Sequence, residues 1–142
     1  MALILDTGPV YASLDRDDDD HRACRSLIES ARESLIIPSP VLVEVDYLVH
    51  QRLHAGVFVA LLNDIVSGAY KVEELEVGDY ARILDLCDRY ADLDIGFVDA
   101  AVIAIVERLD ESKVATLDRR HFSVVRPRHV DALRLLPDGP LP

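Results

Sequence analysis

Short apolar runs alternate with longer amphipathic stretches along this chain. Five runs have the length and composition of buried strands, and they predict strands at Ala2–Leu5, Leu35–Ile37, Tyr70–Val72, Lys113–Thr116 and Ser123–Val125. Helical periodicity predicts helices at Pro9–Leu14, His21–Arg32, Pro40–Leu53, Gly56–Ser67, Asp79–Tyr90 and Gly96–Leu109. The tail after Val125 predicts a last strand or turn and then a frayed end. Alternation of this kind is typical of the α/β class, in which helices flank a parallel sheet.

Two of the predicted strands run directly into an acid. The opening "ALILDTGPV" places Asp6 at the end of an apolar run, and "KVATLDRRHF" places Asp118 just after another. Ligands of parallel sheets bind beyond the carboxyl ends of the strands. Asp6 therefore either caps the helix that follows it or belongs to a charged site at that edge. Asp118 alone would be an ordinary turn aspartate.

A third acid interrupts the apolar face of a predicted helix. In "SPVLVEVDYLVHQRL", Val41, Glu44, Val45 and Leu48 share one face, and Glu44 is its only charge. This spacing predicts a core-facing carboxylate. Buried acids are uncommon unless they are paired or bound to a metal, so Glu44 either pairs with an arginine or contributes to a site.

A fourth acid begins the most apolar helix. Within "DLDIGFVDAAVIAIVERL", Asp99 is the only charge from Ile95 to Val106. The helix dipole favours an acid in the first turn, but burial there needs further compensation. Asp94 lies just before this helix and either caps it or flanks the site.

The chemistry that these acids support depends on their meeting in space. Four carboxylates gathered at one place cannot all stay charged without a counter-cation. Hard oxygen ligands suit Mg²⁺ or Mn²⁺, and such an ion can activate a water molecule and polarise a phosphodiester. Phosphodiester hydrolysis is therefore the leading hypothesis.

Composition narrows the range of partners. The chain has 142 residues, of which 50% are hydrophobic, which predicts one globular domain. Its net charge is −11, from 26 acids and 15 bases. This charge argues against broad binding to phosphate backbones and is compatible with a cation site or a basic protein partner. No apolar run reaches the roughly 18 residues of a membrane span, and no signal peptide is evident, so we expect a cytoplasmic protein.

Taken in order, the acidic segments resemble the motifs of a known family. "LDTGPV", "PSPVLVEVDYLV", "GFVDAAVIAIVERL" and "ATLDRRHF" are similar to the four motifs of PIN-domain ribonucleases, and most of all to the VapC-type toxins of toxin–antitoxin pairs. The resemblance covers residues 1–136, which we expect to form the PIN-like domain, with 137–142 as a C-terminal tail. It implies an α/β/α sandwich around a mainly parallel sheet and a Mg²⁺- or Mn²⁺-dependent endoribonuclease.

The resemblance also implies roles for individual residues. Asp6, Glu44, Asp99 and Asp118 correspond to the catalytic, metal-binding acids of the family. Thr116 matches a hydroxyl that orients the site, and Thr7 and Asp94 are expected as supporting neighbours.

The resemblance further implies partners. These are an RNA substrate, a VapB-type antitoxin that threads a segment over the groove, and a second copy in a homodimer, for which Val57–Ile65 and nearby helices offer apolar residues. Arg119 and Arg120, directly after Asp118, either contact RNA phosphates or form a solvated rim.

The sequence also bears on three alternative classes of protein. A haloacid-dehalogenase-like phosphatase needs a second acid two residues after the first, where this chain has Gly8. A receiver domain needs a well-placed lysine, and this chain has only Lys71 and Lys113. A non-catalytic PIN-like module that binds protein or RNA is the third, and retention of all four acids disfavours it.

Overall fold

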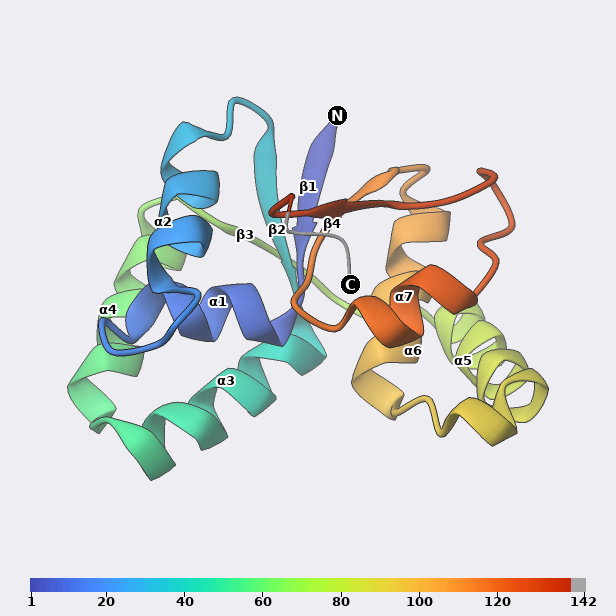
Figure 1. Cartoon of the computed structure of the whole chain (residues 1–142), viewed down its shortest axis with the longest axis horizontal. Helices are drawn as coiled ribbons and strands as arrows, with labels where there is room; N and C mark the ends of the chain where they lie inside the picture. Colours follow the sequence, from blue (N-terminus) through green and yellow to red (C-terminus); the bar gives the residue numbers. More distant parts are fainter. Residues whose placement is uncertain (139–142) are drawn as a thin grey trace.

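A five-stranded parallel sheet forms the centre of the molecule, in the order β3-β2-β1-β4-β5 (Figure 1). The computed structural model describes residues 1–138. The strands are β1 (Ala2–Leu5), β2 (Ser34–Pro38), β3 (Lys71–Glu73), β4 (Lys113–Ala115) and β5 (Arg134–Leu136). The predicted α/β fold with a parallel sheet is confirmed.

The order of the strands creates a switch point beside β1. All four residues of β1 are buried, as expected for a strand covered on both faces. Leu3 pairs with Leu35 of β2 on one side and with Lys113 of β4 on the other. The chain builds outward through β2 and β3, then returns to the opposite side of β1 for β4 and β5. Ligands of open α/β sheets bind where the direction of winding changes in this way.

Helices cover both faces of the sheet, so the domain is an α/β/α sandwich (Figure 1). The described helices are α1 (Thr7–Leu14), α2 (His21–Ser30), α3 (Ser39–Arg52), α4 (Ala55–Val66), α5 (Val77–Arg89), α6 (Phe97–Arg108), α7 (Arg119–Val124) and the 3₁₀ turn η1 (Ala91–Leu93). In Figure 1, α1 to α4 lie on one side of the strands and α5 to α7 on the other. Within residues 1–138, no helix has the length and apolar character required to cross a membrane.

The helix α6 is the central element of its layer. Its residues from Ala100 to Val106 are all buried, which confirms the sequence-based expectation for this apolar segment. An ion-pair network joins it to α5. Arg82, 7% exposed, donates from Nε to Glu107 at 2.7 Å and from Nη1 to Asp85 at 2.6 Å.

Two sequence-based expectations were wrong. The segment Ser123–Val125 is not a strand, because Arg119–Val124 forms the short helix α7. A run of three residues is too short for its period to distinguish strand from helix. The fifth strand is β5, in the tail for which a strand or turn was predicted. Glu44 is not a core-facing residue, since the buried stripe of α3 is Val41, Val45 and Val49, and Glu44 is exposed at its edge.

The C-terminal boundary of the domain stays a prediction. The last strand ends at Leu136, and the expected tail 137–142 lies partly outside the described residues.

Candidate active site

The carboxylate of Asp6 lies at the carboxyl end of the central strand. Asp6 is 5% exposed, and its Oδ2 accepts a hydrogen bond from Thr116 Oγ1 at 2.9 Å. Asp6 occupies the N-cap position of α1, yet its side chain makes no capping hydrogen bond there. Helix capping alone therefore does not explain this acid.

Thr116 connects two of the predicted acids. Its side chain is fully buried, and besides donating to Asp6 it accepts the backbone N–H of Asp118 at 3.0 Å. Both contacts follow from the parallel pairing of β1 with β4, since Leu5 pairs with Ala115 and places the next residues side by side. The hydroxyl thus fixes Asp6 and the start of the Asp118 turn relative to each other.

Asp99 approaches Asp118 from the first turn of α6, and His121 lies between them. Nδ1 of His121 is 2.5 Å from Asp118 Oδ2 and 3.5 Å from Asp99 Oδ2. Its Nε2 is 3.2 Å from the carbonyl oxygen of Leu93. Asp118 also caps α7 by accepting the backbone N–H of His121 at 3.3 Å. Asp118 therefore both caps α7 and contributes a carboxylate to the site.

Glu44 closes the opposite side of the group from α3. Its Oε1 accepts a hydrogen bond from Thr7 Oγ1 at 2.6 Å. No ion pair with an arginine is among the contacts of Glu44 within residues 1–138. The arginine pairing that its sequence position suggested is thus replaced by a hydroxyl contact.

These side chains surround one open pocket of about 570 Å³. Its lining consists of Asp6, Thr7, Gly8, Glu44, Asp99, Leu117 and Asp118. Gly8 permits the close approach of the β4 loop, because a Cβ there would lie 3.2 Å from Cβ and Cγ of Leu117. The four predicted acids therefore converge, from β1, α3, α6 and the turn after β4.

The electrostatics of the pocket follow from burial and from mutual repulsion. Burial raises the pKa of Asp6 to about 6, with Asp99 and Glu44 adding to the increase. Burial also raises the pKa of Asp99, and the nearby Asp118 raises it further. The hydrogen bond to Asp118 raises the pKa of His121. The raised pKa values of the two acids show that negative charge in this pocket is costly, and a bound metal cation would offset that cost.

The donor set fits a hard divalent cation. Among the described residues, Asp99, Asp118 and His121 offer ligand atoms that lie within 4.8 Å of one another. Asp6 adds a buried carboxylate in the same pocket. Carboxylate oxygens are preferred by Mg²⁺ and Mn²⁺.

His121 is the member of the group that sequence reasoning did not single out. Of the basic residues that follow Asp118, only Arg119 and Arg120 were assigned a role from the sequence. The available signal was its spacing, because a side chain three residues after a helix N-cap lies one turn above it.

The remaining predicted site residues lie outside the pocket. Asp94 is exposed, with a φ of 54°, and α6 is capped by Gly96 rather than by Asp94. Arg119 is partly buried and donates to the carbonyl oxygen of Pro137. Arg120 is exposed on α7.

Comparison with known proteins agrees with this fold and site. The chain matches the PIN domain family over residues 3–126. It is 32% identical to ribonuclease VapC26 of Mycobacterium tuberculosis over 125 residues, which cover 88% of this chain and 93% of that protein. The structure also resembles Mycobacterium tuberculosis VapC20, described as a Sarcin-Ricin loop cleaving toxin, with a TM-score of 0.73, 20% identity, and coverage of 79% of this chain and 86% of that one. VapBC2 from Rickettsia felis, bound to a DNA fragment from its promoter, gives a TM-score of 0.69 at 16% identity, with 96% and 98% covered.

The chain belongs to the PIN-domain family. Its four acidic motifs resemble the motifs of that family. Within that family it is a VapC-type ribonuclease, the toxin of a toxin–antitoxin system.

Proposed function

We propose that this chain cuts RNA phosphodiester bonds at a divalent cation, Mg²⁺ or Mn²⁺, held by its carboxylates. The observation that carries the proposal is the convergence of Asp6, Glu44, Asp99 and Asp118 on one open pocket. Two of these acids, Asp6 and Asp99, have a raised pKa in the absence of a cation. A group of acids that costs free energy when charged, and that still faces solvent, is suited to bind a cation.

Each acid has a proposed task. Asp6, Asp99 and Asp118 hold the cation, which when bound supplies Lewis acidity toward the phosphate and toward a water nucleophile. Glu44 binds the cation through water or orients the attacking water, since it is the most exposed of the four. Thr7, through its 2.6 Å contact, keeps the Glu44 carboxylate directed into the pocket.

The supporting residues act on the acids rather than on RNA. Thr116 holds Asp6 and the Asp118 turn in register. His121 positions the Asp118 carboxylate through its Nδ1 contact. Asp94, on the loop before α6, is a neighbour of the site that cleavage does not require.

The exposed helix α7 is the proposed phosphate contact. Arg120 is exposed there, close in sequence to Asp118. Arg119 contributes by a different route, because its guanidinium is bound to the carbonyl of Pro137 and so stiffens the chain beside the pocket.

Two protein partners complete the proposal. A VapB-type antitoxin with basic side chains would complement the acidic pocket and the net charge of −11. A homodimer would use exposed apolar residues such as Val59 and Leu62 of α4 and the helices near them.

Cleavage of RNA by the partner-free chain tests the proposal. The purified chain is incubated with total RNA and Mg²⁺ or Mn²⁺, with EDTA, Asp99→Asn and the surface variant Asp19→Asn as controls. We expect cleavage by the wild type and by Asp19→Asn, and none in EDTA or with Asp99→Asn. If the folded chain cleaves nothing under either metal, the non-catalytic binding module replaces this proposal. If Asp99→Asn cleaves at the wild-type rate, the assignment of the acids is wrong.

A further inference from the structure

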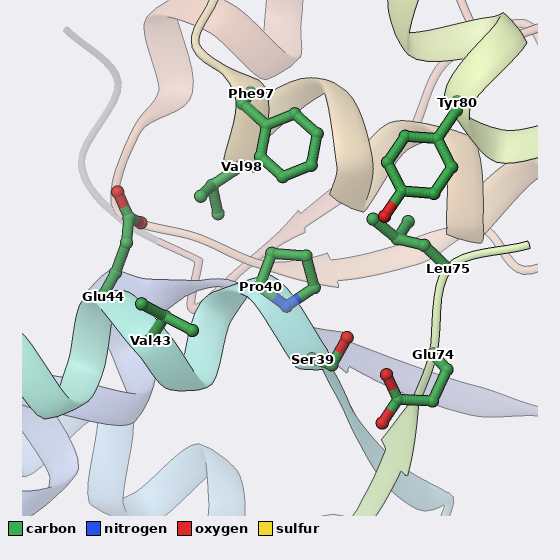
Figure 2. Close-up of a pocket in the computed structure, with 9 residues that line it drawn as sticks. All are labelled: Ser39, Pro40, Val43, Glu44, Glu74, Leu75, Tyr80, Phe97 and Val98. Carbon is green, nitrogen blue, oxygen red and sulfur yellow. The ribbon is translucent and has the colours of Figure 1, made fainter.

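An apolar cavity of about 410 Å³ adjoins the acidic pocket and has no role in the chemistry above (Figure 2). It is lined by Ser39, Pro40, Val43, Glu44, Glu74, Leu75, Tyr80, Phe97 and Val98. These residues come from the start of α3, the loop after β3, α5 and the start of α6. The cavity is large enough for a planar ring system with room for water at its edges.

Two aromatic side chains form one side of this cavity. The rings of Tyr80 and Phe97 are stacked, with centroids 6.3 Å apart and an interplanar angle of 28°. Tyr80 is 54% exposed and Phe97 is 48% exposed, so much of each residue remains available for contact. In Figure 2 both rings lie on one side of the cavity, and Pro40 and Val43 of α3 lie across from them.

The cavity is continuous with the catalytic pocket. Glu44 lines both, so its carboxylate marks the boundary between the apolar walls and the four acids. Figure 2 shows Glu44 at one end of the cavity and Glu74 with Ser39 at the other. Whatever fills the cavity therefore lies beside the four acids.

The wall opposite α3 is held in place by ion pairs. Arg108 donates from Nη2 to the carbonyl oxygen of Glu74 at 3.0 Å and from Nη1 to Glu73 at 2.9 Å. Its Nε donates to the buried carboxylate of Asp79 at 3.1 Å. These contacts fix the loop after β3 and the start of α5 to α6, so the cavity exists before any ligand arrives.

We propose that this cavity binds one unpaired nucleobase of the RNA, from a nucleotide next to the bond that is cut. The inference rests on the proposed function for its link to cleavage. Proteins recognise single-stranded RNA by stacking unpaired bases on aromatic side chains, and Tyr80 and Phe97 supply such a surface. Among the residues that line the cavity there is no basic side chain, so its interior suits a base rather than a phosphate. The carboxylates of Glu44 and Glu74 accept hydrogen bonds, which favours bases with an exocyclic amino group over uracil.

Nucleotide titration tests the cavity without requiring activity. AMP, CMP, GMP and UMP are added to the wild-type chain with Mg²⁺, and the ring proton resonances of Tyr80 and Phe97 are followed by NMR, with ribose 5-phosphate as the base-free control. We expect both rings to shift with AMP, CMP and GMP, less with UMP, and not with ribose 5-phosphate. Binding should fall in Tyr80→Leu and Phe97→Leu and persist in Tyr47→Leu, whose ring is exposed on α3 outside the cavity.

A second measurement links the cavity to cleavage. Once the cut site is mapped, an abasic residue replaces each nucleotide beside it in a synthetic RNA. One such replacement should lower kcat/KM by about 10- to 100-fold. Phe97→Leu should cause a similar loss, and the two changes together should cost little more than either alone.

The possible outcomes separate the two proposals. Ring shifts without any RNA cleavage would contradict the proposed function and leave the base site standing. Cleavage with no ring shift for any nucleotide would overturn the base site alone. Ring resonances that move with protein concentration rather than with nucleotide would assign the cavity to a second copy of the chain and would overturn the base site. Fully additive losses from Phe97→Leu and the abasic replacement would overturn it as well.

Discussion

The buried acid at the end of β1 should destabilise the metal-free protein, and neutralising it should therefore stabilise that state. The pKa of Asp6 is about 6 in the fold, against an ordinary value of 3.8. One pKa unit corresponds to about 1.4 kcal/mol, so the charged side chain costs about 3 kcal/mol at neutral pH. Asp6→Asn removes that charge and keeps an oxygen that accepts the hydrogen bond of Thr116.

The pH dependence has a definite sign. A carboxyl whose pKa is raised by folding takes up protons on folding, so its ionisation destabilises the native state as pH rises. The increase in the free energy of unfolding of Asp6→Asn over the wild type should be absent below about pH 4. It should grow between about pH 4 and 6 and level off at about 3 kcal/mol above that range. A divalent cation should make the wild type more stable than Asp6→Asn, because it binds the folded wild type more tightly than the folded variant.

Urea unfolding followed by circular dichroism measures this directly. Wild type, Asp6→Asn and the surface control Asp19→Asn are compared in EDTA at about pH 5 and about pH 7.5, and again with Mn²⁺. Asp19→Asn should match the wild type throughout. If Asp6→Asn is no more stable than the wild type in EDTA at neutral pH, the buried charge is already compensated within the fold. The argument that the pocket needs a cation then loses its electrostatic basis.

Three further substitutions test other parts of the fold and site. Thr116→Val removes a buried donor to Asp6 and should lower the free energy of unfolding by about 1–3 kcal/mol and reduce RNA cleavage, as measured by urea unfolding and kcat. Arg82→Met leaves Glu107 as a buried, unpaired acid and should cost about 3–5 kcal/mol, most of which the added change Glu107→Leu should restore; equal stability of Arg82→Met and the wild type would contradict this. Because folding raises the pKa of His121, its stabilisation should be present below its unfolded pKa of about 6.5 and lost as pH rises through the folded value. His121→Asn in EDTA should therefore be less stable than the wild type near pH 6 and equal to it near pH 9, and a difference that persists at high pH would refute the role of its charge.

The sequence predicted the elements that are long or fully buried and missed those defined by tertiary contact. The apolar sequence predicted the strand Ala2–Leu5 and the helix beginning near Phe97, because an apolar segment is stable in water only when it is buried. The segment Ser123–Val125 was assigned to a strand because its three residues carry no measurable period. Its helical state depends on Asp118, whose side chain caps the turn before it.

The site was predictable as a set of acids, but the contacts that organise it were not. Sequence position indicated that Asp6 and Asp118 follow strands, and a parallel sheet brings such ends together. The hydrogen bond from Thr116 to Asp6 requires β1 and β4 to be neighbours in the sheet. No pattern in a single sequence specifies that pairing. The exposure of Glu44 depends on how α3 rotates against the sheet, and a four-residue stripe leaves that rotation uncertain by about one position.

The distribution of basic residues limits how so acidic a chain can contact RNA phosphates. Several arginines are engaged within the fold, since Arg82 and Arg108 join α5 to α6 and Arg128 contacts Asp85 at 3.3 Å. Such arginines neutralise acids of the protein and contribute less to the phosphate contacts that dominate the affinity of basic nucleases. Under the two proposals above, recognition of RNA would depend more on the cation at the acids and on the base-binding cavity beside them. The proposed basic antitoxin would compete for the pocket, because the field that repels RNA phosphates attracts a basic segment. The acidity of the chain would thus favour binding of that antitoxin, and the proposed cation would offset the acidity at the pocket where RNA is cut.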